Sequence, residues 1–397
     1  MRARPPSMVL QVYTAGMLQG CAFVLIPALG NLLEAPPFGL SAAAYGALFL
    51  PMTGGAILSA LAAGPLQTRF GALGVFRLGL ACNLTALVLL ASSAGAAGHW
   101  PAYLLLMAET AFLGLGFGLT LAAINHFAAA LFPDRATAAV TVLNAGIGGS
   151  TALSPLALHL AVNLLHWWLW PALLAAGFAL LLATSSGMHI QGMPGSEVVT
   201  VGGGETPSRR PLILFGAAVL IYAICEGTFG SWAKIYLSVT HPFPARYGAW
   251  ALSAFWGSMT LFRVGLGVLP QRWLSPAAQY QAAPVTIGLC FLAVSQLTSP
   301  WALVAAYAAA GAACSIYYPY AMSFALRCFP GAQTQVAGVL VAALMAGEGI
   351  GSYALGPLQS YVGLGALYGL SALWTVPLLA LAVYLTRYTA RMVKSAP

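Results

Sequence analysis

Residues 211–239 read PLILFGAAVLIYAICEGTFGSWAKIYLSV, an apolar run whose only charged side chains are Glu226 and Lys234. A helix of about 20 apolar residues crosses a hydrocarbon core about 30 Å thick, so this run is long enough to span a bilayer. Peptide groups in lipid must be hydrogen-bonded within the protein, and the run lacks the alternation of polar and apolar residues that marks a barrel strand. It therefore predicts a transmembrane helix with a carboxyl group near its middle.

The composition extends this prediction to the whole chain. Its 397 residues are 60% hydrophobic and 6% charged, whereas soluble globular proteins carry about 25% charged residues. The apolar blocks predict an all-α membrane protein with twelve transmembrane helices, at residues 9–33, 41–66, 72–93, 101–132, 137–164, 170–188, 211–239, 247–269, 282–298, 301–326, 335–361 and 364–386.

One extended polar stretch, residues 189–210, divides the predicted helices into six and six. It contains Gly202, Gly203 and Gly204, and glycine-rich segments form flexible linkers. We expect a cytoplasmic linker here, between an N-terminal six-helix bundle at 1–188 and a C-terminal one at 211–397. Short matches between the halves, such as GPLQTR at 64–69 with GVLPQR at 267–272, predict an internal repeat and two pseudo-symmetric bundles.

The basic residues predict the orientation, because Lys and Arg are enriched in cytoplasmic loops. Placing both termini in the cytoplasm puts twelve of the fifteen basic residues on that side: Arg2, Arg4, Arg69, Arg77, Arg135, Arg209, Arg210, Arg272, Arg327, Arg387, Arg391 and Lys394. The net charge of +8 therefore follows from topology, and we expect a multi-pass protein of the cytoplasmic (inner) membrane.

Several classes of function are disfavoured by what the sequence lacks. The six cysteines and six histidines are scattered, with no CxxC or HxxxH pair, so no metal site is expected. The single aspartate, Asp134, lies in a predicted loop, and no catalytic arrangement of Ser, His and Asp can be assembled. No basic face with interleaved aromatic residues indicates nucleic-acid binding. We expect neither an enzyme nor a cofactor.

Charged residues inside the predicted helices are the most informative signal, because each costs about 2.5 to 3.5 kcal/mol in mid-membrane and is usually functional. Glu226, Glu348 and Glu109 are the candidates for proton coupling, with Glu226 first because it lies midway along its helix. The alternative for Glu226 is a structural ion pair with Arg263 or Lys234. Glu348 has glycine neighbours typical of close helix packing, and Glu109 lies nearer an interface, where water would hydrate it.

Neutral polar and aromatic residues in the same helices are candidates for binding a solute. Amides exchange hydrogen bonds with hydroxyl groups and aromatic rings stack on C–H faces, so together they suit a neutral polyhydroxylated ligand, although each residue alone is equally consistent with packing. The substrate-binding candidates are Gln19, Asn125, Asn144, Tyr222, Trp232, Tyr317, Tyr318 and Tyr320, and the candidates for gates or ion pairs are Arg263, Lys234, Arg69 and Arg272.

The chain resembles the major facilitator superfamily over nearly its whole length, and within it the fucose, galactose and glucose proton symporters. The segments that carry the resemblance are GMLQGCAFVLIPALGNLL at 16–33, AAINHFAAALFPDR at 122–135, YAICEGTFGSWAKIYL at 222–237 and FWGSMTLFRVGLG at 255–267. The branch's Glu, Ser-Trp and Tyr-Leu pattern maps onto Glu226, Ser231, Trp232, Tyr236 and Leu237. Its Gly-Arg segment maps onto Arg263, and an Asn common in its fourth helix onto Asn125.

The resemblance implies a monomeric carrier that imports a sugar or similar small polar solute by alternating access, together with a proton. Two departures bear on proton coupling. The superfamily's G-x-x-x-D-R-x-G-R loop lacks its acidic member here, where Gln67, Thr68 and Arg69 stand, and the acidic residues of fucose permeases in helices 1 and 4 correspond to Gln19 and Leu121.

A second interpretation keeps the fold and reverses the task. An apolar cavity with one or two carboxylates and many aromatic rings would also serve an exporter of amphipathic compounds. The Gly-x-x-x-Gly-Pro pattern of antiporters is incomplete, because Ser154 precedes Pro155, which mildly disfavours export.

Overall fold

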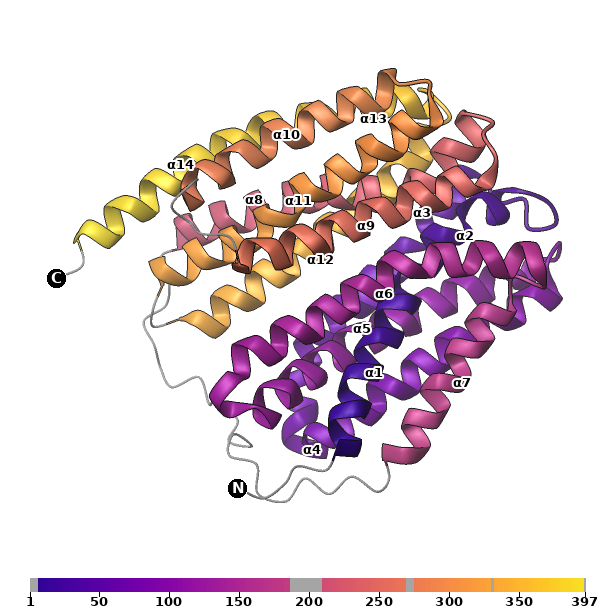
Figure 1. Ribbon diagram of the computed structural model, residues 1–397, viewed down its shortest axis with the longest axis horizontal. Helices are drawn as coiled ribbons and strands as arrows, with labels where there is room; N and C mark the ends of the chain where they lie inside the picture. The colour runs from indigo at the N-terminus through magenta and orange to yellow at the C-terminus, as the bar shows by residue number, and fades with distance from the viewer. Residues whose placement is uncertain (1–5, 186–208, 269–274, 330–331, 396–397) are drawn as a thin grey trace. The chain divides into compact units, whose positions relative to one another are not determined.

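The computed structural model describes residues 6–185, 209–268, 275–329 and 332–395, and the regular elements in these ranges are all helical (Figure 1). The chain divides into two compact units, Met1–Thr200 and Val201–Pro397. Most of the predicted linker, residues 189–208, lies outside the described residues, whereas its last two residues, Arg209 and Arg210, begin a helix.

The first unit carries the helices of the N-terminal half. A break separates its first two helices at Val24, because Pro27 has no amide hydrogen to donate to the carbonyl oxygen of Phe23. In chain order the helices are α1 (Pro6–Phe23), α2 (Leu25–Glu34), α3 (Ala42–Ala47), α4 (Phe49–Ser93), α5 (Trp100–Leu131), α6 (Ala136–Leu164) and α7 (Leu169–Thr184).

The second unit carries the helices of the C-terminal half. Its first helix ends in a π-helical turn at Tyr236–Thr240, and α10 and α14 run side by side along the unit (Figure 1). The helices are α8 (Arg209–Ile235), α9 (Ala245–Val268), α10 (Pro276–Gln296), α11 (Pro300–Cys328), α12 (Gln333–Leu358), α13 (Leu364–Ser371) and α14 (Thr375–Ser395).

The helices account for the twelve predicted crossings. Nine stretches of the described residues are long and apolar enough to span a membrane. One of them, Ala42–Ala96, holds two predicted helices that meet within α4 at Gly71, whose φ of 71° is a left-handed conformation that favours glycine. The remaining two crossings are α7, which has 16 residues, and α9, which carries Arg246 and Arg263. Nine, one and two give twelve.

The same helix pairs dominate the packing of both units, as expected for an internal repeat. The first and fifth crossings pair as α1 with α6 and as α8 with α12. The second and fourth pair as α9 with α11 and, in the first unit, where the part of α4 around Gly55 meets α5. Glycine residues allow the backbones of paired helices to approach closely. A Cβ at Gly20 would collide with the backbone of Ile147, and a Cβ at Gly311 with the backbone of Phe255. Small residues at such crossings let helix backbones meet in the absence of a hydrophobic driving force.

α10 and α14 extend farthest beyond their predicted bounds among the helices of the second unit. α10 begins at Pro276 rather than at 282, because the Ser275 side chain accepts a hydrogen bond from the Ala278 amide at 3.2 Å and Pro276 occupies the first helical position. α14 continues to Ser395 rather than ending at 386, and Thr389, beyond the predicted end, is buried.

Candidate functional site

The site centres on an ion pair between two transmembrane helices of the second unit. Glu226 lies midway along α8 with its side chain 4% exposed, and its Oε1 lies 3.6 Å from Nη2 of Arg263 on α9. The Arg263 side chain is 40% exposed, so one end of the pair is covered by helices and the other is accessible. Of the two partners considered for Glu226, the structure brings Arg263, not Lys234, into ion-pair distance.

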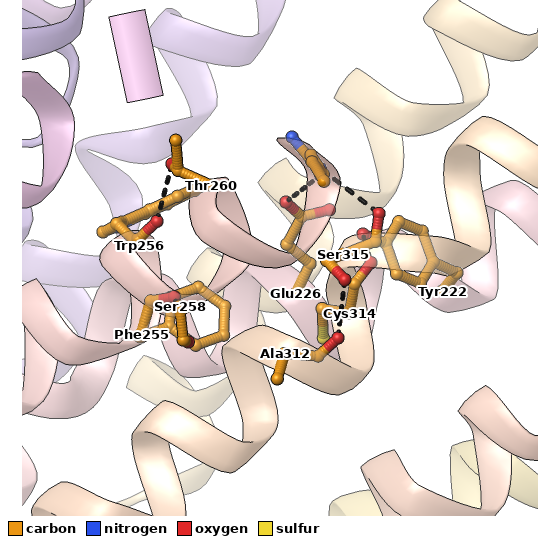
Figure 2. Close-up of polar contacts among 10 residues, drawn as sticks. Tyr222, Glu226, Phe255, Trp256, Ser258, Thr260, Ala312, Cys314 and Ser315 are labelled. Carbon is orange, nitrogen blue, oxygen red and sulfur yellow. Dashed lines mark hydrogen bonds and ion pairs between the residues drawn. The ribbon is translucent and has the colours of Figure 1, made fainter. Parts of the chain in front are cut away.

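A proline in α11 explains how the arginine is held. Pro319 lies inside this helix and has no amide hydrogen to donate to the carbonyl oxygen four residues earlier, which is that of Ser315. Arg263 Nε donates to this free carbonyl at 3.4 Å. One turn of α11 thus supplies a backbone acceptor that anchors the Arg263 guanidinium beside Glu226. Figure 2 labels Glu226 and Ser315, the two residues that this side chain joins.

Tyr222 fixes the neighbouring surface, one helical turn before Glu226 on the same face of α8. Its hydroxyl donates to the Cys314 carbonyl oxygen at 2.7 Å, and its ring stacks on Tyr317 with centroids 5.1 Å apart and an interplanar angle of 16°. Tyr317 stacks in turn on Tyr280 at 4.3 Å. Both Tyr222 and Tyr317 are buried, so they form a rigid wall behind the ion pair.

A second carboxyl group joins the pair from α12. Glu348 is half-buried, and its carboxyl group interacts electrostatically with both Glu226 and Arg263. The Tyr318 hydroxyl interacts with the same three charges. Glu348 also has the packing role that its glycine neighbours predict, because a Cβ at Gly227 of α8 would lie 3.0 Å from the Glu348 Cα atom.

The charges of this cluster do not balance when both carboxyl groups are ionised. Two carboxylates face one guanidinium, and Glu226 Oε2 is buried with no hydrogen-bond partner among the residues that the structure describes. Unbalanced charge is costly in a low-dielectric surrounding. One proton added to the cluster would make it neutral, so the arrangement is chemically suited to binding a proton or a solute that donates hydrogen bonds.

Three other candidates of the second unit lie away from the ion pair. The Trp232 indole donates to the Ser352 carbonyl oxygen at 2.9 Å, a contact that joins α8 to α12. The Tyr320 hydroxyl donates to Gln279 Oε1 on α10 at 3.1 Å. Lys234 is buried where α8 packs against Gly248 of α9.

The first unit holds a cluster of neutral polar side chains. Asn83 Nδ2, on α4, donates to Gln19 Oε1 on α1 at 2.6 Å and to Thr120 Oγ1 on α5 at 3.1 Å. Nearby along α5, Asn144 Nδ2 of α6 donates to Asn125 Oδ1 at 3.1 Å. Sequence reasoning missed Asn83, although a single amide inside an apolar helix is a signal that a partner exists.

Glu109 of α5 differs from the expectation that water hydrates it. The residue is fully buried, and within the described part of the chain neither carboxyl oxygen has a hydrogen-bond partner. The segment around it is helical and apolar, which is why its position in the sequence did not reveal this burial.

Two further candidates for gates or ion pairs are Arg69 and Arg272. Arg69 lies on α4 just before the Gly71 break, with its guanidinium 5.3 Å from the centre of the Phe70 ring. Arg272 lies outside the described residues.

Comparison with solved structures identifies the fold of the chain. No protein-family model matches the chain, and no curated protein sequence does. The solved structure of a mutant of the nucleoside transporter NupG matches with a TM-score of 0.77 and 14% identity, covering 95% of this chain and 99% of that one. The peptide transporter POT in complex with sulfate matches with a TM-score of 0.76 and 16% identity, covering 97% and 95%. The prediction of fold class is confirmed: the chain has the all-helical major facilitator fold.

Proposed function

We propose that this protein is a secondary transporter that moves a small polar solute across the cytoplasmic membrane by alternating access, coupled to a proton, as a monomer with both termini in the cytoplasm. Two observations support the proposal. The fold is that of the solved structures of a nucleoside transporter and a peptide transporter, and the second unit carries an ion pair between two helices whose carboxylate partner is buried.

The single observation that carries the proposal is the contact between Glu226 and Arg263. Removing two charges from water costs free energy that apolar side chains in the same place would not cost. The presence of this ion pair in mid-membrane therefore favours a functional role over a stabilising one. A proton on Glu226 weakens the pair and leaves Arg263 to interact with Glu348 or a solute. Loss of the proton restores the pair. This exchange couples protonation to the state of the site, with Glu348 and Glu109 as further coupling candidates.

The solute we propose is a sugar or a similar polar metabolite rich in hydroxyl groups. The accessible guanidinium of Arg263, together with Glu348 and Tyr318, offers donors and acceptors to hydroxyl groups. In the first unit, Gln19, Asn125 and Asn144 remain separate amide candidates for binding a hydroxylated solute. This cargo agrees with the resemblance to sugar symporters, and the two similar transporters add nucleosides and peptides to the classes worth testing.

The test is uptake into proteoliposomes under an imposed pH gradient, with a panel of labelled sugars, nucleosides and dipeptides. We expect accumulation of a sugar by the wild type and its loss in Glu226→Gln. Glu34→Gln is the matched control, because Glu34 ends α2 in the first unit and its substitution removes the same charge elsewhere. Uptake of no panel member, combined with Glu226-dependent efflux of amphipathic dyes, would replace this proposal with the exporter.

A further inference from the structure

The exposed face of α14 carries a stripe of aromatic and basic side chains that the transport proposal does not use. We propose that this face binds the headgroup of an anionic phospholipid through Arg387 and Arg391. Tyr384, Arg387, Tyr388 and Arg391, here called the α14 stripe, follow one another along the last turns of the helix. With Ala380 and Val383 they line a shallow groove of about 340 Å³.

The rotation of α14 about its axis is fixed by contacts on the opposite face. Thr386 Oγ1 accepts a hydrogen bond from Gln281 Nε2 of α10 at 2.6 Å, and the Thr389 hydroxyl lies 3.4 Å from Cys328 Sγ of α11. Leu385, on the same face, is fully buried. The stripe therefore points away from α10 and α11.

The two tyrosines suit the boundary between acyl chains and headgroups. Tyr384 is 51% exposed, and its ring stacks on Tyr388 with centroids 6.4 Å apart and an interplanar angle of 13°. Tyrosine rings are enriched at this depth of a bilayer. From Tyr384 to Arg391 the helix rises about 10 Å, whereas the headgroup layer is about 5 to 8 Å thick, so the stripe extends from the acyl boundary through the headgroups.

The two arginines complement a phosphate group. Arg387 and Arg391 are both exposed. Among the residues that the structure describes, neither forms an ion pair or a hydrogen bond; the ion pair there joins Arg263 to Glu226. Guanidinium groups bind phosphate through two parallel hydrogen bonds. Ala380 and Val383 continue the groove toward the membrane, and this apolar end favours a phosphate that carries acyl chains. Basic residues beside a cytoplasmic membrane surface also attract anionic lipids in general.

Native mass spectrometry of the full-length protein, purified in detergent and given equal amounts of phosphatidylglycerol and phosphatidylcholine, tests the proposal. We expect the wild type to retain phosphatidylglycerol in preference, and retention to fall about fivefold for each arginine removed in R387Q, R391Q and the double variant. The matched control is R135Q/R327Q, which removes the same total charge from exposed arginines outside the stripe.

Two results would overturn the proposal. One is equal retention of phosphatidylglycerol by the wild type and the R387Q/R391Q variant. The other is an equal loss in the R135Q/R327Q control, which would show attraction by net charge alone. Thermal unfolding of each variant checks that it is folded, and added salt should lower retention of phosphatidylglycerol by the wild type itself, because the contact is ionic. Retention by the wild type that is insensitive to salt would also contradict the proposal.

Discussion

Pro319 determines how Arg263 is held, because its ring nitrogen leaves the Ser315 carbonyl oxygen free to accept from the guanidinium. Pro319→Ala restores an amide hydrogen that competes for this carbonyl. We expect equal or higher resistance to unfolding, since an interior proline costs a helix about 3 kcal/mol, together with slower solute uptake. The pair of measurements is thermal unfolding in detergent and uptake in proteoliposomes. Pro284→Ala, in α10, is the control, and unchanged uptake after Pro319→Ala would show that this anchor is dispensable.

Glu109 allows a test of whether a carboxyl group that is buried in a helix bundle must also take part in proton coupling. It is buried without a hydrogen-bond partner in the described residues, and a buried polar group without a partner costs about 1 to 3 kcal/mol. Glu109→Leu should therefore raise the free energy of unfolding by about that amount. Uptake driven by a pH gradient should persist, because we propose that Glu226 is the main coupling group. Unfolding in detergent–SDS mixtures measures the first quantity. Loss of gradient-driven uptake in this variant would assign part of the coupling to Glu109.

At the scale of elements, glycines decide how closely α8 and α12 approach. A Cβ at Gly347 would collide with the Leu220 carbonyl oxygen and one at Gly351 with the Ile224 carbonyl oxygen, whereas a Cβ at Gly338 of the same helix meets open space. Overpacking of this kind costs about 1 to 3 kcal/mol. Gly347→Ala and Gly351→Ala should lower the free energy of unfolding by this amount, and Gly338→Ala should not. Equal effects of all three substitutions would refute the packing account.

Element boundaries show where sequence reasoning succeeds and where it fails. Apolar length predicts the crossings because lipid imposes it, and mid-helix charge singles out Glu226 and Arg263 because isolated charge in lipid is costly. The extension of α14 past 386 could not be predicted in this way, because a helix does not end where the membrane ends. The hydrogen bond from Arg263 to the Ser315 carbonyl oxygen could not be predicted either. Pro319 frees this carbonyl, but its partner depends on which side chain of α9 faces α11.

The two units of the molecule share the same pairing of helices, but the polar contacts between their helices differ in kind. In the first unit the polar contact across α1, α4 and α5 joins Asn83 to Gln19 and Thr120, and in the second unit the contact between α8 and α9 is an ion pair. Amides bind hydroxyl groups without changing charge, whereas a carboxylate beside a guanidinium responds to protons. We therefore propose that the main coupling group, Glu226, lies in the second unit, although the repeat gives both units the same helix pairing.

The most direct measurement compares two modes of transport in Glu226→Gln proteoliposomes. Counterflow exchanges labelled for unlabelled solute without net proton movement, whereas accumulation under a pH gradient requires coupling. We expect Glu226→Gln to retain counterflow and to lose accumulation, because the site would still bind solute but could no longer exchange a proton. Accumulation retained by this variant at the wild-type level would contradict the assignment of coupling to Glu226, and loss of both modes to the same extent would show that the ion pair serves the fold or the binding of solute instead.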